Sequence, residues 1–225
     1  MKIFVCACAL IAAAGSAMGQ VRTLTFEGTA TPFANPTGNG QGIDAPNNYY
    51  NGGFTLGGNG PGPNWGIQFV SQSLTILDSD TPGGSGNFAN EPTGETVLFF
   101  IGAAGSAAVM NVLPGFDTGF ATYYSSITQP GTIRVWDGLN ATGNVLATIP
   151  LNPLGSAGNG DPTGSYDTWA LVGTNFAGTA FSVSFEGAPN FIAFDQVTFG
   201  SNIPAPGAIA LLGMGGLIAT RRRRA

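Results

Sequence analysis

Short runs of β-favouring residues, each closed by a cluster of glycine, asparagine or proline, follow one another from Thr23 to Phe199. Several runs alternate with a period of two, as at Phe181, Val183 and Phe185, which is the repeat of a strand with one buried face. No segment between the two ends of the chain has a helical period. Many short strands separated by turn residues predict an all-β fold, an antiparallel β-sandwich.

The strands are expected where β-branched and aromatic residues gather, at 23–26, 53–56, 68–77, 96–101, 107–113, 119–125, 132–137, 145–149, 168–172, 180–185 and 191–199. Two long connections, 32–66 and 78–94, are rich in glycine, asparagine and proline. Connections of this length in a compact domain are usually functional or mobile, so we expect a site there.

Charge is scarce and unevenly placed. Charged residues make up 8% of the chain, against about 25% in an average globular protein. Of the seven basic residues only Arg22 and Arg134 lie between the two ends, together with all twelve acidic residues, so the central part carries about −10. Such a surface excludes nucleic acid as a partner, because phosphate binding depends on Lys and Arg. It is compatible with divalent cations and neutral sugars.

The chain lacks the side chains that carry most hydrolytic chemistry. It has no histidine, and its two cysteines, Cys6 and Cys8, fall in the amino-terminal apolar run. A disulfide framework, a thiolate metal site, a histidine base and a serine–histidine triad are thereby excluded from the central part. A pair of carboxylates could still hydrolyse a glycosidic bond, but no pair among the twelve is singled out. We therefore predict a protein that is not an enzyme, with a secreted carbohydrate-active enzyme as the alternative.

The amino-terminal end has the pattern of an export signal. Lys2 gives a basic start, residues 3–14 are apolar, and Ala17-Met18-Gly19 offers the small-x-small pattern that signal peptidase accepts. A signal peptide at residues 1–19 is therefore predicted. An uncleaved anchor is the alternative, although the apolar run is shorter than the ~20 residues of a membrane span.

The carboxyl-terminal end combines a proline-rich motif, an apolar segment and a basic block. The motif is Pro204, Ala205, Pro206 and Gly207, the apolar segment continues to Thr220, and the block is Arg221, Arg222, Arg223 and Arg224. An apolar helix followed by arginines stops in a membrane with the arginines on the cytoplasmic side. From Gly207 to Thr220 such a helix would be about 21 Å long, short of the ~30 Å hydrocarbon core. We expect a temporary membrane tether.

This layout at residues 203–225 resembles the PEP-CTERM sorting signal, in which an exosortase cuts the tail and releases the protein to the cell surface. Ala205 departs from the pattern, because the family has glutamate there. The resemblance implies an exported protein that is first tethered by its tail and then found at the cell surface or in the extracellular matrix. A plain tail anchor without processing is the alternative.

Three segments of the central part, 25–28, 49–54 and 192–199, resemble the jelly-roll sandwiches of carbohydrate-binding modules. The resemblance implies a structural calcium held by Glu27 near the first strand and Asp195 in the last, with Asp44, Asn47 and Asn48 supplying further oxygen ligands. The alternative is that Glu27 and Asp195 are simply exposed strand-end residues.

Further polar and aromatic residues occupy the two long connections. Asp78, Asp80, Asn87, Glu91 and Glu95 form a second oxygen-rich group, but position twelve of an EF-hand counted from Asp78 is Ala89, so a solvated turn is favoured. A flat aromatic ring can stack on the apolar face of a sugar. Tyr49, Tyr50 and Trp65 lie in the first connection and are the rings predicted to bind glycan.

The expected organisation is a signal peptide at 1–19, a sandwich domain at 20–202 and a sorting tail at 203–225. The expected partners are signal peptidase, an exosortase-type enzyme, the membrane before processing, and extracellular polysaccharide. The function predicted is non-catalytic glycan binding at the cell surface. A purely structural matrix subunit is a further alternative.

Overall fold

The computed structural model describes residues 21–103, 107–158 and 164–200, and every regular element in these ranges is a strand. The predicted signal peptide and sorting tail lie outside the described residues. Within the described ranges, no helix is long and apolar enough to cross a membrane.

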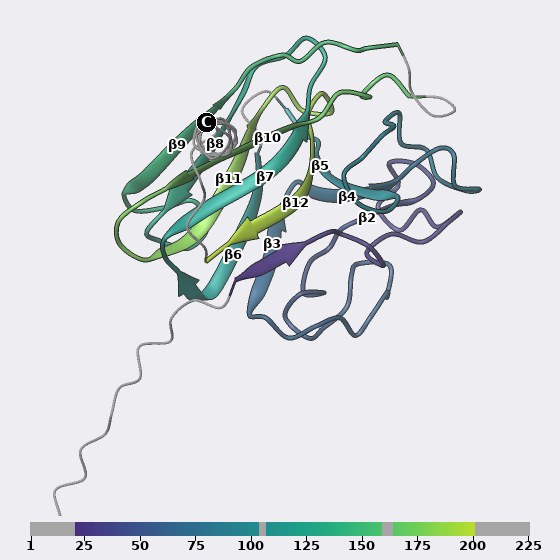
Figure 1. Cartoon of the computed structure of the whole chain (residues 1–225). Coiled ribbons are helices and arrows are strands. Elements are labelled where there is room, and N and C mark those ends of the chain that lie inside the picture. Colours follow the sequence, from purple (N-terminus) through teal and green to yellow (C-terminus); the bar gives the residue numbers. More distant parts are fainter. Residues whose placement is uncertain (1–20, 104–106, 159–163, 201–225) are drawn as a thin grey trace, which may run out of the picture.

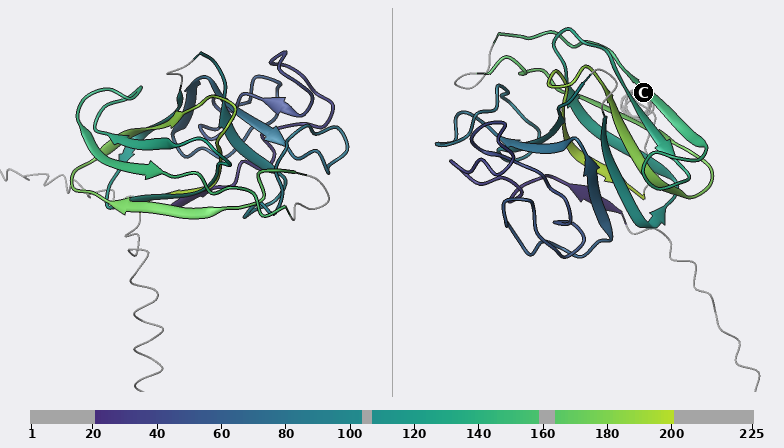
Figure 2. Two further views of the ribbon diagram at one scale, coloured as in Figure 1. Left: turned by 90° about the horizontal axis from the view of Figure 1, so that it is seen from above. Right: turned by 180° about the vertical axis from the view of Figure 1, so that it is seen from behind.

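The strands form two antiparallel sheets stacked as the two layers of a β-sandwich, as Figure 2 shows from above. The seven-stranded sheet has the order β10 (Ala170–Asn175), β7 (Gly119–Ser125), β12 (Ala193–Phe199), β5 (Thr96–Phe100), β4 (Ser73–Leu77) and β2 (Ile43–Asp44), and β1 (Arg22–Leu24) also pairs with β12. The five-stranded sheet has the order β3 (Ile67–Ser71), β6 (Ala107–Phe116), β11 (Ala180–Gly187), β8 (Gly131–Trp136) and β9 (Val145–Leu151) (Figure 1). The prediction of an all-β sandwich is confirmed.

The core lies between the sheets and is rich in phenylalanine. The side chains of Phe100, Phe120, Phe185 and Phe194 are completely buried there. Phe185 and Phe194 come from opposite sheets, and their ring centroids are 4.8 Å apart. Burial of each such side chain contributes about 1.5–3 kcal/mol, so this layer supplies most of the hydrophobic stabilisation.

Two features of the predicted strand pattern are wrong. Residues 53–56 form no strand, while Ile43–Asp44, inside the predicted connection, pairs with Ile76–Thr75 of β4. The predicted strand 68–77 is two strands that belong to different sheets, because the chain crosses at Gln72. At this crossing the Ser73 hydroxyl donates to the Val70 carbonyl at 2.6 Å and accepts from the Val109 amide at 3.1 Å.

The outer face of the seven-stranded sheet is also apolar. Alternate residues of β5, Val97 and Phe99, point away from the core that Leu98 and Phe100 enter. Phe88 of the second long connection packs on this face beside Ile76 of β4, and Ile43 of the first packs against Phe99. Residues of both connections in which the sequence predicts a site, 32–66 and 78–94, therefore lie on this face.

Candidate functional site

A hollow of about 290 Å³, here named the outer hollow, opens on the outer face of the seven-stranded sheet. Its walls come from β4, β5, the start of β12, the loops that join β4 to β5 and β11 to β12, and the loop before β10: Ile76, Ser85, Gly86, Asn87, Phe88, Val97, Phe99, Tyr166, Asn190, Phe191, Ile192 and Ala193. None of these side chains is charged. The hollow thus combines apolar and aromatic walls with a few amides and hydroxyls, the usual composition of a small-ligand site.

Hydrogen bonds hold the mouth of the outer hollow in place. The Asn87 side-chain oxygen accepts the Ser165 amide at 3.1 Å, and the Tyr166 amide donates to the Asn87 carbonyl at 3.2 Å. The Asn190 amide donates to the Phe100 carbonyl at 2.8 Å. Asn87 and Asn190 are exposed, and the Phe191 ring is 47% exposed. Two asparagine side chains and the Phe191 ring are therefore held at the mouth of the outer hollow, where a ligand could reach them.

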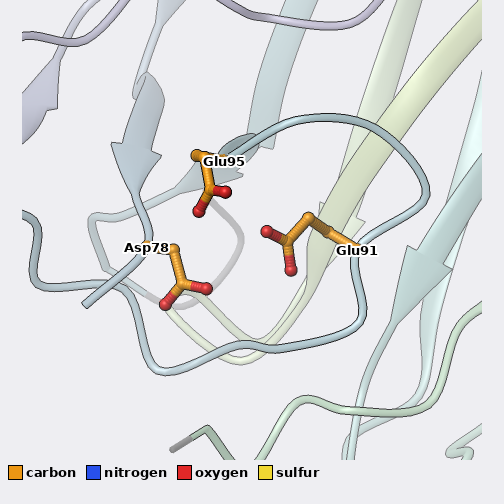
Figure 3. A group of neighbouring side chains, drawn as sticks. All are labelled: Asp78, Glu91 and Glu95. Atoms are coloured by element: carbon orange, nitrogen blue, oxygen red, sulfur yellow. The ribbon is translucent and has the colours of Figure 1, made fainter. Parts of the chain in front are cut away.

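Three carboxylates, Asp78, Glu91 and Glu95, form an acidic cluster nearby on the same connection and point toward one another (Figure 3). Each offers an oxygen within 4.8 Å of the others. Asp78 follows β4 directly, Glu95 directly precedes β5, and β4 pairs with β5, so the sheet itself brings these two together. The sequence already marked these residues as oxygen-rich, but favoured a solvated turn.

Two members of the acidic cluster have a raised pKa. Burial raises the pKa of Asp78 to about 6, and the neighbouring charges of Asp80 and Glu95 add to the rise. Burial likewise raises the pKa of Glu91 to about 7, with the charges of Asp78, Glu95 and Asp195 adding to it. Three hard oxygen donors that repel one another fit a divalent cation such as Ca²⁺, which prefers carboxylate oxygens.

Glu27 and Asp195, the predicted calcium ligands, both hold the segment that carries the acidic cluster. Glu27 Oε1 accepts the backbone amides of Glu95 at 3.0 Å and Thr96 at 2.9 Å. A bulge in β12 at Gln196 (φ 47°) disturbs the register, and the Asp195 side chain reaches Thr93 from this point. Both carboxylates thus make hydrogen bonds that position residues 93–96.

Asp44, another predicted ligand, is 1% exposed and organises a different loop. Its carboxylate accepts the Thr55 hydroxyl at 2.6 Å, the Gly57 amide at 2.9 Å and the Asn59 side-chain amide at 3.1 Å. Asn47 is half-buried, and its carbonyl accepts the Phe69 amide at 2.8 Å. Among the described carboxylates, those that gather within metal-ligand reach are the acidic cluster and not Glu27, Asp44 and Asp195.

Tyr49, Tyr50 and Trp65 lie together but are packed by the protein. Tyr50 is 4% exposed, stacks on Trp65 with centroids 5.6 Å apart, and accepts the Phe26 amide at its hydroxyl. The Tyr49 ring meets Tyr50 edge-on at 5.1 Å, and the Arg22 guanidinium lies over Trp65. The prediction that Tyr50 stacks on a sugar needs correction, because its ring belongs to the core.

Sequence reasoning missed the outer hollow. Its aromatic residues, Phe88, Phe99, Tyr166 and Phe191, are spread over four segments, and only the pairing of strands brings them together. The alternation of Val97 and Phe99 with Leu98 and Phe100 was the available signal, since a strand apolar on both faces needs cover on both.

The sequence matches no model of a known protein family, and it matches no curated protein. Solved structures with a similar arrangement include the K2 cleaved adhesin domain of Lys-gingipain, at 13% identity and TM-score 0.45 over 80% of this chain and 97% of that one. Others are CsCBM6-3 from Clostridium stercorarium in complex with cellobiose (19%, 0.35, 56% and 91%) and a carbohydrate-binding module from Cellvibrio mixtus lichenase 5A in complex with cellotriose (12%, 0.33, 57% and 86%). All these scores are below 0.5, so the sandwich assignment rests on this chain's own strand pairing.

Proposed function

We propose that this chain is an exported, non-catalytic protein of the cell surface that binds a neutral glycan in the outer hollow. The observation that carries the proposal is the lining of the hollow, which offers aromatic rings and exposed amides and no charged side chain. Rings pack against the apolar faces of sugars, and amides both donate to and accept from their hydroxyl groups.

The direction of β12 supports a tethered binding protein. This strand begins at Ala193, in the wall of the outer hollow, and ends at Phe199, about 20 Å farther along at the usual strand rise. The predicted sorting tail follows from residue 203. A tether at that end would leave the outer hollow on the far end of the strand, open to a ligand.

Binding is tested with a glycan array and with polysaccharide pull-down of the central domain. Phe191→Ala removes an exposed ring of the hollow and should lower binding at least tenfold. Phe54→Ala is the matched control, because Phe54 is 51% exposed on another loop and does not line the outer hollow. Binding unaffected by Phe191→Ala would move the site elsewhere, and no binding to any glycan would favour the structural matrix subunit.

We propose further that a structural Ca²⁺ is held by Asp78, Glu91 and Glu95 rather than by the ligand set that the resemblance implied. The ion would offset the repulsion among these carboxylates and tie the start of β5 to the end of β4. The melting temperature should rise in millimolar Ca²⁺ and fall in chelator, and Asp78→Asn should abolish this response. Asp117→Asn, an exposed change of equal charge, should leave it intact. A response that survives in Asp78→Asn would exclude this site.

A second candidate function is a glycoside hydrolase that uses the acidic cluster. The raised pKa of Glu91, about 7, is the property that a general acid needs. The acidic cluster does not line the outer hollow, which favours binding without hydrolysis. Release of reducing sugar from a polysaccharide panel, lost in Glu91→Gln, would establish the enzyme instead.

Export and sorting are tested separately, by mass spectrometry of the mature protein from membrane and released fractions. A carboxyl terminus near residues 203–206 in the released fraction would support cleavage by an exosortase-type enzyme. Retention of Arg221–Arg224 in the membrane fraction would leave a plain anchor.

A further inference from the structure

A second hollow, here named the side hollow, has a volume of about 320 Å³ and shares two lining residues with the outer hollow. Phe99 and Asn190 line both, and the side hollow adds Asn39, Ile43, Ile101 and Pro189. A ligand too large for one hollow could therefore continue into the other without leaving the surface.

Strand β5 sets the direction of this combined groove. Val97 and Phe99 face the outer hollow, and Phe99 and Ile101 line the side hollow. Alternate residues of a strand lie about 7 Å apart, so these three side chains span roughly 13 Å along one line. That length exceeds a single sugar ring and suits a chain lying parallel to the strand.

The polar groups are distributed along the groove rather than gathered at one point. Asn87 stands at the outer hollow, Asn39 at the side hollow and Asn190 between them, and all three are exposed. Within the described part of the chain, no hydrogen bond occupies the Asn190 side chain, whose backbone is fixed at φ 66° and by the bond to Phe100. Its amide is therefore available to a ligand at the junction.

Neither hollow has a charged side chain, although the domain as a whole is strongly acidic. An acidic polysaccharide would meet a repulsive surface with no Lys or Arg in the groove, whereas a neutral chain loses nothing. Spaced amides on an apolar floor match repeated hydroxyl groups on successive sugar rings.

We infer that the outer hollow and the side hollow are successive subsites for one neutral oligosaccharide, which lies along β5 across Phe99 and Asn190. This inference rests on the proposed glycan function and adds the class of ligand, a chain of at least two sugar rings. Phe191 serves the outer subsite, Asn39 the side subsite, and Asn190 both.

The test is calorimetry with glucose, xylose and mannose and with their β-1,4-linked oligomers of two to six units. Affinity should rise at least tenfold from the monosaccharide to the oligomers of the series that binds. Asn39→Ala should remove most of that gain and leave the short ligand unaffected. Asn190→Gly, which keeps the backbone conformation, should weaken all lengths, and Phe54→Ala should weaken none.

Two results distinguish failure of the two-subsite groove from failure of the proposed glycan binding. Equal affinity for a monosaccharide and its oligomers, with Asn39→Ala and Asn190→Gly silent, would overturn the two-subsite groove and leave glycan binding in place. No heat of binding with any member of the three series, from a sample whose circular dichroism shows the folded domain, would overturn both for these sugars.

Discussion

The Asp195 carboxylate in β12 accepts both the backbone amide of Thr93, at 2.8 Å, and its hydroxyl, at 2.9 Å. Asp195 is completely buried, so these hydrogen bonds are shielded from water. They connect the last strand to the segment between Glu91 and Glu95, and so position two of the three carboxylates of the acidic cluster. Loss of this contact should therefore displace carboxylates of the acidic cluster and also lower the stability of the fold.

We expect Asp195→Asn to lower the free energy of unfolding by about 1–3 kcal/mol at pH 8, since an amide cannot accept all the hydrogen bonds that the carboxylate accepts. Urea denaturation gives the value. Asp117→Asn carries the same charge change at an exposed position and should cost at most about 0.5 kcal/mol. Equal effects of the two variants would contradict the role given to Asp195.

The pH dependence of stability should run opposite to that of most acidic groups. Burial raises the pKa of Asp78 and of Asp195, both ordinarily 3.8, to about 6 in the folded chain, and that of Glu91, ordinarily 4.5, to about 7. The folded state therefore binds these protons more tightly than the unfolded state. In chelator, stability should be greatest near pH 4 and fall as pH rises through about 7, by an amount on the order of 5 kcal/mol after allowance for solvent screening at Glu91.

Glu91→Gln should reduce this dependence, because the glutamine cannot ionise, while Asp78 and Asp195 still titrate. Saturating Ca²⁺ should flatten it too if the cation occupies the acidic cluster, since it favours the ionised carboxylates. Thermal melts at pH 5 and pH 8, with Ca²⁺ or chelator, measure both effects. A melting temperature in chelator that rises from pH 5 to pH 8 would contradict the pKa values.

Gly94 should be hard to replace, because the Glu27 side chain occupies the space that a side chain at position 94 would need. A Cβ at Gly94 would lie 2.2 Å from the Glu27 carboxyl carbon, and its φ of +56° disfavours other residues. Gly94→Ala should cost about 2–4 kcal/mol, by combining backbone strain with the displacement of Glu27. Gly38→Ala has similar strain, φ +74°, and no atom within 4 Å, so it should cost only about 1 kcal/mol.

The sequence was sufficient for the class of fold and for the long connections that line the candidate site, because both follow from local patterns. Alternation at Phe181 to Phe185 indicates a strand, and the length and composition of the connections at 32–66 and 78–94 indicate the segments in which a site is expected. Contacts between residues far apart in the chain could not be predicted from these local patterns. The meeting of Asp78 with Glu95 depends on the pairing of β4 with β5, and the packing of Tyr50 depends on Phe26 and Phe69.

The crossing between β3 and β4 was missed for a related reason, since the pattern of residues 68–77 is that of one strand, and only the pairing with two different sheets divides it. Ser73, 3% exposed, stabilises the crossing through its bonds to Val70 and Val109. Ser73→Ala should lower the free energy of unfolding by about 1–3 kcal/mol, because the buried Val109 amide loses its partner.

Ser125 provides a matched substitution with the opposite expectation. Within the described residues, its buried hydroxyl has no hydrogen-bond partner, so Ser125→Ala removes an unsatisfied polar group. Stability should stay within about 0.5 kcal/mol of the parent or rise by up to about 1 kcal/mol. Urea denaturation of both variants measures the difference. If Ser125→Ala proved as destabilising as Ser73→Ala, the cost would come from lost packing and not from the hydrogen bonds at the crossing.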